Sequence, residues 1–260
     1  ATAIKKDIFY FENVTLVSAT KSDFARDNSM KNVTYVVVSS KDGKEKKVID
    51  EIRYNTSMSS SFTHKNIITL PNGHLRQRSQ RITQIDADTR QIISDMIAAT
   101  LDWEAHRPNE VAVALAAVQI DKPVRIVIIR ADFDNKENKN FQVLINPEIT
   151  KYEGEIITDY EGCLSVKDVY GKVPRYSKIR GRAIDINGNR IKIKSTDPFL
   201  SRVLQHEVDH TNGICFVDHI AHDQDAFSVL TKSGDLVACP YSKVINSGII
   251  ADDEDNRALR

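Results

Sequence analysis

Residues 199–212 read Phe-Leu-Ser-Arg-Val-Leu-Gln-His-Glu-Val-Asp-His-Thr-Asn, and this segment gives the main indication of the fold. Asp197 and Pro198, directly before it, are typical of a helix start. Gly213, directly after it, is typical of a helix end because glycine adopts the left-handed conformation that closes many helices. The sequence therefore predicts an α-helix between these two signals.

His206 and His210 are four residues apart, so in a helix they share one face and both imidazoles can reach one ion. Phe199 and Val203 precede His206 by seven and three residues, which places the histidines on the apolar, inward stripe of the helix. Glu207 projects to one side, where it can contact a water molecule on the ion. The His-Glu-x-x-His spacing therefore predicts a metal site inside the protein.

The composition is that of a globular protein. The chain has 260 residues, 41% of them hydrophobic, with 36 basic and 36 acidic side chains. A formal charge of zero removes the broad electrostatic case for binding nucleic acid or an anionic membrane. The glycine motifs of dinucleotide, P-loop and serine-hydrolase sites do not occur.

Further sequence features bear on the compartment. Residues 1–11, Ala-Thr-Ala-Ile-Lys-Lys-Asp-Ile-Phe-Tyr-Phe, lack the apolar stretch expected of a secretory signal, and we find no apolar run long enough to span a bilayer. Three cysteines do not make a disulfide framework. We expect a soluble protein of a reduced compartment, the cytoplasm or an organelle stroma or matrix.

The chain divides into three parts by pattern. Residues 1–64 predict a β-rich N-terminal extension that ends in a linker rich in serine and threonine. Residues 65–222 predict the main domain. Residues 223–260 are weakly patterned and end in an acidic segment, so we expect this C-terminal tail to fray.

The order of elements in the main domain favours an α+β fold over a βαβ repeat. Apolar residues at helical spacing around residues 93–101, with Asp86 or Asp88 as a cap, predict a first helix. Residues 124–129 and 141–146 read as buried strands, and Asn187-Gly188 marks a hairpin. We therefore expect antiparallel β-sheets packed around a central helix that carries the His-Glu-x-x-His motif.

A catalytic metal needs a third protein ligand and an open coordination position. His219 and His222 follow the helix at spacings that fit neither usual metalloprotease arrangement. Upstream, residues 161–165 read Glu-Gly-Cys-Leu-Ser, which we interpret as a loop with one cysteine. Cys215 and Cys239 are interpreted as small buried hydrophobic residues.

The Glu-Gly-Cys-Leu-Ser segment and the His-Glu-Val-Asp-His segment together resemble the second and third motifs of the peptide deformylases, in the family's order and approximate separation. The family's first motif is similar to residues 112–119, Ala-Val-Ala-Leu-Ala-Ala-Val-Gln. The resemblance covers about residues 66–222. Its smaller matches are Leu75-Arg76, Val173-Pro174-Arg175 and Asn212-Gly213.

The resemblance implies a metal ion held by Cys163, His206 and His210, with water in the fourth position. In the family the metal in cells is typically Fe(II), with nickel or cobalt active and zinc often less so. A thiolate with two imidazoles suits a soft-to-borderline divalent ion but does not choose iron over zinc.

The resemblance also implies a hydrolase that removes the formyl group from N-formylmethionyl peptides of nascent proteins and releases formate. In that role Glu207 accepts the proton of the attacking water and returns it to the leaving amine. The Gln119 side chain and the backbone N–H of Leu164 donate to the oxyanion. We expect Glu161 and Arg175 to pair as support for the site, although an ordinary surface ion pair is an equal alternative.

The first motif departs from the family pattern, because Ala112 and Ala114 replace its two glycines and Val118 replaces its proline. A methyl group at each glycine position is expected to narrow or redirect the approach of the peptide. The hydrophobic pocket for the methionine side chain is expected to include Val113 and Val203, beside Ala114.

Two rival functions follow from the residues. A zinc endopeptidase of the His-Glu-x-x-His type would not need Cys163. A divergent relative with reduced activity, binding peptide N-termini, would account for the two alanines. Family members act on nascent chains at the ribosome, but no basic tail here supports docking, so a ribosome contact is an extrapolation.

Overall fold

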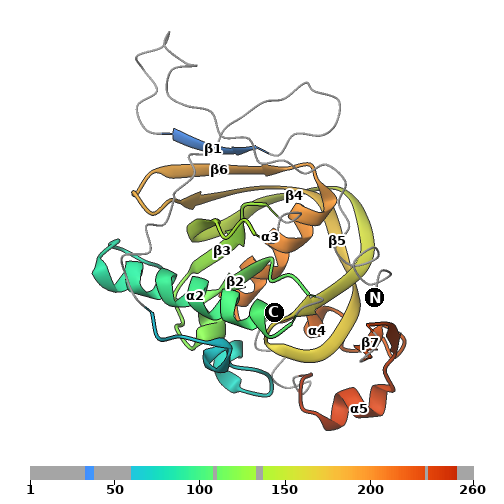
Figure 1. Ribbon diagram of the computed structural model, residues 1–260. Helices are drawn as coiled ribbons and strands as arrows, with labels where there is room; N and C mark the ends of the chain where they lie inside the picture. The colour runs from blue at the N-terminus through green and yellow to red at the C-terminus, as the bar shows by residue number, and fades with distance from the viewer. Residues whose placement is uncertain (1–32, 38–59, 108–109, 133–136, 232–233, 251–260) are drawn as a thin grey trace.

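The computed structural model describes residues 33–37, 60–107, 110–132, 137–231 and 234–250 (Figure 1). Within them one mixed sheet organises the fold, in the order β1-β6-β5-β4-β3-β2, and β7 and β8 extend it from β5. All strand pairs are antiparallel except β1 with β6. The strands are β1 Val33–Val37, β2 Ala114–Ala116, β3 Ile126–Arg130, β4 Phe141–Cys163, β5 Val166–Ile184, β6 Arg190–Ser195, β7 Phe227–Leu230 and β8 Leu236–Ala238.

The two long helices form where the sequence predicts them. Asp86 caps α2, and its side chain accepts a hydrogen bond from the Thr89 N–H. Asp197 caps α3 with Pro198 in the first turn, so both predicted helix starts are confirmed. The helices are α2 Ala87–Ala105, α3 Pro198–Thr211, α4 Phe216–His219 and α5 Tyr241–Asn246, with short 3-10 turns η2 His64–Asn66, η3 Gly73–Arg76 and η4 Ala117–Ile120.

Strand β3 lies between the two long helices. Its alternate residues Val127 and Ile129 belong to the apolar cluster that includes Leu200 and Leu204 of α3. Ile126 and Ile128, on the other face, pack in the cluster that includes α2. Because both faces are buried, this strand reads as a continuous apolar run, and the expected α+β arrangement around a central helix is confirmed.

Strands β4 and β5 form a long hairpin that bends around α3 (Figure 1). Pairing runs from Ile145 opposite Ile184 to Cys163 opposite Val166, with register shifts that include one between Gly162 and Cys163. Such bulges bend a strand and re-aim its side chains. The interpretation of residues 161–165 as a loop was therefore wrong at its start, because Glu161, Gly162 and Cys163 end β4.

The C-terminal segment up to residue 250 is packed and does not fray. Strand β7 pairs with β5 and with β8, and Val244 of α5 is buried. Phe227 packs in one apolar cluster with Phe216 and Cys239. The apolar segments of β7, β8 and α5 are too short to show a period in the sequence. The order of this C-terminal segment is therefore evident only from its packing against other elements.

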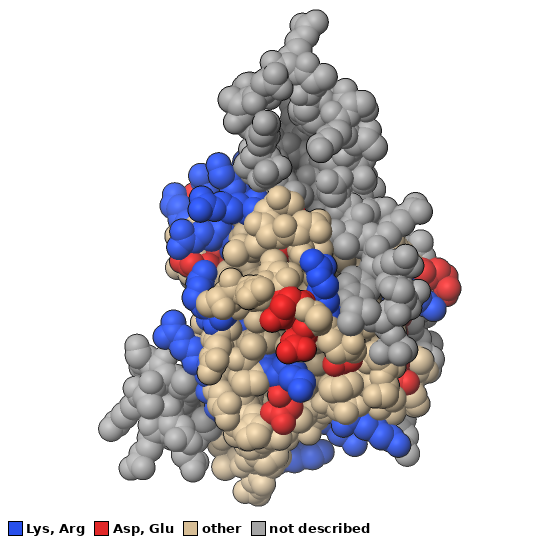
Figure 2. All heavy atoms as spheres, turned by 90° about the vertical axis from the view of Figure 1, so that its left-hand side faces the viewer, with Lys and Arg blue, Asp and Glu red and all other residues tan. Residues whose placement is uncertain are grey.

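The N-terminal prediction is tested only at β1, which pairs in parallel with β6. The other strands expected in residues 1–54 lie outside the described residues, and the domain division stays a prediction. No helix of the described residues is both long and apolar enough to cross a bilayer. On the face in Figure 2, side chains of both charges lie among uncharged ones.

Candidate metal centre

The three predicted ligands come together from two elements distant in sequence. The ligand atoms of Cys163, His206 and His210 all lie within 4.8 Å of one another. The Cys163 Sγ is 3.2 Å from His210 Nε2, which is 3.1 Å from His206 Nε2. Strand β4 supplies the sulfur from its last residue, and α3 supplies both imidazoles from one face.

Glu161 orients the first histidine. Its Oε2 is 2.9 Å from His206 Nδ1. Although burial opposes ionisation, Arg175 and the His206 hydrogen bond hold the pKa of Glu161 well below its usual range. An ionised carboxylate only accepts, so the His206 proton lies on Nδ1 and Nε2 is left to bind an ion.

Arg175 and Arg202 hold Glu161 in turn. The Arg175 Nε donates to Glu161 Oε1 at 2.8 Å, and the Arg202 guanidinium donates to the same oxygen at 2.9 Å. Glu161, Arg175 and Arg202 are each at most 6% exposed. The expected pairing of Glu161 with Arg175 is therefore buried, unlike an ordinary surface ion pair.

Three residues of this network were missed in the sequence. Arg175 also donates to Asp209 Oδ2 at 2.5 Å, and His219 Nε2 lies 2.7 Å from the same oxygen. Arg202 precedes His206 by four residues on α3, a helical spacing that could have marked it. Asp209 and His219 carry no comparable signal, because their meeting with Arg175 depends on how β5 and α4 pack against α3.

Glu207 is buried beside the three ligands, with 4% of its surface exposed, and it lines the pocket described below. Its Oε2 has no hydrogen-bond partner among the described residues. Burial raises the pKa of Glu207 to about 7. A carboxyl with a pKa near neutrality can both accept and donate a proton.

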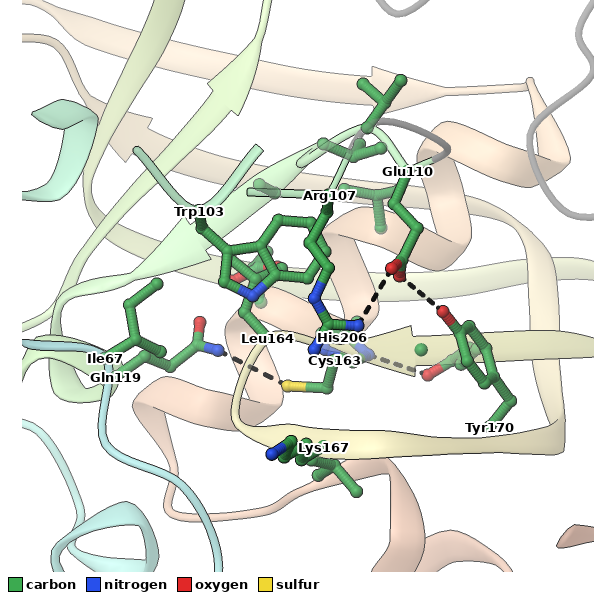
Figure 3. A pocket seen from close by; sticks show the side chains of 18 of the residues that line it. Ile67, Trp103, Arg107, Glu110, Gln119, Cys163, Leu164, Lys167, Tyr170 and His206 are labelled. Carbon is green, nitrogen blue, oxygen red and sulfur yellow. Dashed lines mark hydrogen bonds and ion pairs between the residues drawn. The ribbon is translucent and has the colours of Figure 1, made fainter. Parts of the chain in front are cut away.

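Gln119 is held with its amide nitrogen facing the sulfur. Its Oε1 accepts from the Ala116 N–H at 2.8 Å, which fixes the orientation of the amide. Its Nε2 then lies 3.0 Å from Ser165 Oγ and 3.4 Å from Cys163 Sγ (Figure 3). Gln119 and Leu164 therefore lie at the same site as Cys163, and both line the pocket.

A pocket of about 420 Å³ opens onto this group of residues. Val113, Ala114 and Val203 line it, as expected for a hydrophobic subsite. Ala112 does not line it, and its N–H is bound by Glu104 Oε2 at 3.1 Å. The expectation that both alanines narrow the pocket was therefore wrong for Ala112, because this residue precedes β2, is fully buried, and has its backbone bound by Glu104 and Arg130.

The pocket rim opposite Gln119 carries a network that the sequence did not reveal. Arg107 lies 3.1 Å from Glu110 and 3.0 Å from Asp168, and its guanidinium stacks over Trp103 at 5.3 Å. Tyr170 donates to Glu110 at 2.7 Å (Figure 3). The Tyr170 ring also explains Gly162, since a Cβ there would lie 2.5 Å from it.

A second group of ligand-type side chains, His64, Asp102 and His106, lies at the pocket edge. The His64 Nδ1 is 2.6 Å from Asp102 Oδ2, and His106 Nδ1 is 2.7 Å from the Asp102 carbonyl oxygen. These hydrogen bonds account for the arrangement without an ion.

The group of Cys163, His206 and His210 does fit a metal ion. Two imidazole nitrogens and one sulfur face one another, and the outer nitrogen of His206 is occupied by Glu161. This is a donor set for a divalent metal, with second-sphere hydrogen bonding of the usual kind. With the buried Glu207 beside it, the arrangement defines a metal-dependent hydrolase.

Comparisons with known proteins give the family. The family model described as polypeptide deformylase matches residues 64–226. The chain is 37% identical over 160 residues to the peptide deformylase of Agrobacterium fabrum, covering 62% of this chain and 89% of the relative. It is 38% identical over 157 residues to that of Wolinella succinogenes, covering 60% and 87%. The chain belongs to the peptide deformylase family, hydrolases that remove the N-formyl group from nascent peptides.

Solved structures agree. A peptide deformylase from Legionella pneumophila matches with a TM-score of 0.52 at 33% identity, covering 59% of this chain and 83% of that one. One from Synechococcus elongatus, in complex with actinonin, matches with a TM-score of 0.51 at 32% identity, covering 59% and 76%. The family assignment replaces the alternative of a zinc endopeptidase.

Proposed function

We propose that Cys163, His206 and His210 hold one divalent metal ion, Fe(II) in cells, in a site that deformylates N-formylmethionyl peptides. The observation that carries this proposal is the convergence of one sulfur and two imidazole nitrogens within 4.8 Å, at the base of a pocket. Zinc, nickel and cobalt also suit this donor set, so the preference for iron rests on the family resemblance.

When bound, the ion supplies a lowered pKa for water and polarisation of the substrate carbonyl. Glu207 accepts the proton from the attacking water and later delivers it to the leaving amine. Its buried position and its pKa of about 7 suit both transfers. The Glu161 carboxylate, held by Arg175 and Arg202, keeps the His206 ring oriented throughout.

We assign Gln119 and Leu164 to the oxyanion that develops on the formyl oxygen. The Gln119 amide is fixed by the Ala116 N–H, so its NH₂ group needs no reorganisation during the reaction. The backbone N–H of Leu164 is the second donor that the family resemblance implies. Losing one donor of this kind usually costs about 10²–10³ in rate.

The substrate is a peptide that begins with N-formylmethionine. Val113, Ala114 and Val203 give the pocket an apolar wall for the methionine side chain. A formylated nascent chain implies synthesis in a bacterial-type cytoplasm or an organelle, where we place the protein. Contact with the ribosome is a further prediction of this role.

The test is anaerobic reconstitution with Fe(II), followed by a formate-release assay on short formylmethionyl peptides. We expect about one metal ion per chain and formate release in proportion to metal content. The Cys163→Ala variant, treated in parallel, is expected to lose both. Full metal content and turnover in that variant would contradict the assignment of Cys163.

A second candidate is a relative with reduced activity that binds peptide N-termini. Ala114 favours it, because its methyl group lies in the pocket wall where the family has glycine. Saturable binding of formylmethionyl peptides by the iron-loaded protein without formate release would support this candidate, and measurable turnover would reject it.

A further inference from the structure

A second cavity, of about 480 Å³, lies against α3 at Val208 and Asn212. It has no lining residue in common with the catalytic pocket. Its other walls come from the segment that precedes α2, the residue directly before β3, and β4. A ligand in this cavity would therefore be separate from the metal centre.

Three arginines, Arg78, Arg81 and Arg125, line this cavity together with one carboxylate, Glu148. That carboxylate is already engaged, because the Arg182 Nη2 donates to Glu148 Oε2 at 2.9 Å. The charged groups on the wall therefore leave an excess of positive charge facing the cavity. An anion is the ligand that this charge favours.

Arg125 is the buried member of the three, with 7% of its surface exposed. Its guanidinium donates to Asn212 Oδ1 at 2.9 Å and to the carbonyl oxygens of Thr211 and Pro147 at 3.3 and 3.1 Å. All three acceptors are neutral, so no carboxylate in hydrogen-bond contact compensates the charge. Burial, with Arg78 and Arg81 nearby, lowers the pKa of Arg125.

Two donors on this wall are unused. Arg125 Nε and Ser79 Oγ are buried and have no hydrogen-bond partner among the described residues. Ser79 is 5% exposed, and its N–H is fixed by the Thr211 carbonyl oxygen at 3.0 Å. Arg78 and Arg81 are exposed, so their guanidinium groups can close over a ligand from the solvent side.

We propose that this cavity binds a phosphate group. Guanidinium groups present a planar fork of N–H donors that matches phosphate oxygens, and a phosphate group has enough oxygens to accept from more than one arginine. The phosphate group can come from free inorganic phosphate or from the backbone of an RNA strand. This site goes beyond the proposed hydrolysis and does not depend on it.

The experiment titrates the full-length, metal-loaded protein with inorganic phosphate, and separately with a short oligouridylate, in isothermal calorimetry at low ionic strength. Acetate at equal ionic strength is the monoanion control. We compare the wild type with the double variant Arg78→Ala/Arg81→Ala. The matched control, Lys65→Ala/Lys243→Ala, also removes two positive charges, at exposed positions that line neither cavity.

We expect saturable phosphate binding that is at least about tenfold weaker in the arginine variant and unchanged in the lysine variant. Tighter binding of the oligouridylate, lost in the same variant, would identify a backbone phosphate as the source, whereas binding of phosphate alone would identify the free ion. Absence of saturable binding of either probe, equal binding of acetate, or equal weakening in both variants would overturn the proposal. Formate release is expected to be unchanged in both variants, so this result is independent of the catalytic assignment.

Discussion

Two arginine–glutamate pairs of the β4–β5 hairpin differ in burial but little in geometry. Near the metal centre, Arg175 Nε lies 2.8 Å from Glu161, with side-chain exposures of 5% and 3%. Farther along the same two strands, Arg180 Nε lies 2.7 Å from Glu153, with exposures of 56% and 25%. The two distances are nearly equal, so the pairs differ in burial and not in geometry.

The buried pair supports the orientation of the site, whereas the exposed pair contributes little. An exposed pair gains little because water screens the charges. A buried carboxylate must be compensated, and Glu161 is compensated by Arg175, Arg202 and the hydrogen bond to His206. Removing Glu161 should therefore disturb several groups at once, whereas removing Glu153 should disturb only its exposed arginine and lysine partners.

The largest contrast between buried and exposed carboxylates is expected at Glu207. In Glu207→Gln the proton acceptor is lost, so kcat/KM for formate release should fall about 10²–10⁴-fold. Metal content, measured on the same sample, should be unchanged because Glu207 is not one of the three ligands. Glu153→Gln is the control, with activity near that of the wild type. Full turnover in Glu207→Gln would contradict the assignment of Glu207 as the proton acceptor.

A large effect on stability is expected at Glu161. In Glu161→Gln the buried Arg175 and Arg202 lose their charged partner, which should lower the free energy of unfolding by about 3–5 kcal/mol. The same change at Glu153 should cost about 0.2–1 kcal/mol. Both variants are compared with the wild type by urea unfolding in the presence of a chelator, so that metal binding does not contribute. Equal losses would mean that burial does not distinguish the two pairs.

The same two glutamates are expected to differ, by a smaller effect, in their influence on metal affinity. Without the Glu161 carboxylate the His206 ring is less well oriented, so Glu161→Gln should weaken metal binding about 10–100-fold. Competition with a chelator of known affinity measures the change. Glu153→Gln should bind metal as the wild type does. An affinity that is unaltered in Glu161→Gln would show that the ring needs no such support.

The smallest effect is expected in the wall of the catalytic pocket, at Ala114 of β2. Ala114→Gly removes a methyl group from the pocket lining, so KM for a formylmethionyl peptide should fall a few-fold. This change is smaller than the roughly tenfold discrimination that one methylene group of a substrate gives in a hydrophobic pocket. Ala112→Gly is the matched control, because Ala112 lies outside the pocket lining. If both variants changed KM equally, the pocket shape would not explain the effect.

Local patterns predicted the two long helices and the placement of His206 and His210 on one face of α3. Helix α3 begins and ends at the predicted signals, and Asp86 caps α2 as expected. These predictions succeed because capping and helical spacing act within a few residues. Cys163 was assigned as the third candidate ligand through the family resemblance, because nothing in the spacing along the chain relates residue 163 to residues 206 and 210.

Other features were beyond the reach of local patterns. The packed segment of β7, β8 and α5 has apolar runs too short to show a period. The rim network of Arg107, Glu110 and Tyr170 joins residues about sixty positions apart, and its partners are defined only when β5 folds over the pocket. That Ala114 lines the pocket while Ala112 is buried outside it depends on the contacts of Ala112 with Glu104 and Arg130.

The two long helices, the Asn187-Gly188 hairpin, the family and the candidate metal ligands could be read from the chain, because each depends on side chains close together in it or on an extended motif. The burial of Glu161, its contacts with Arg175 and Arg202, and the cavity lined by three arginines appear only in the folded protein. Burial and electrostatic compensation arise between elements packed together in space, and the spacing of residues along the chain does not encode those distances.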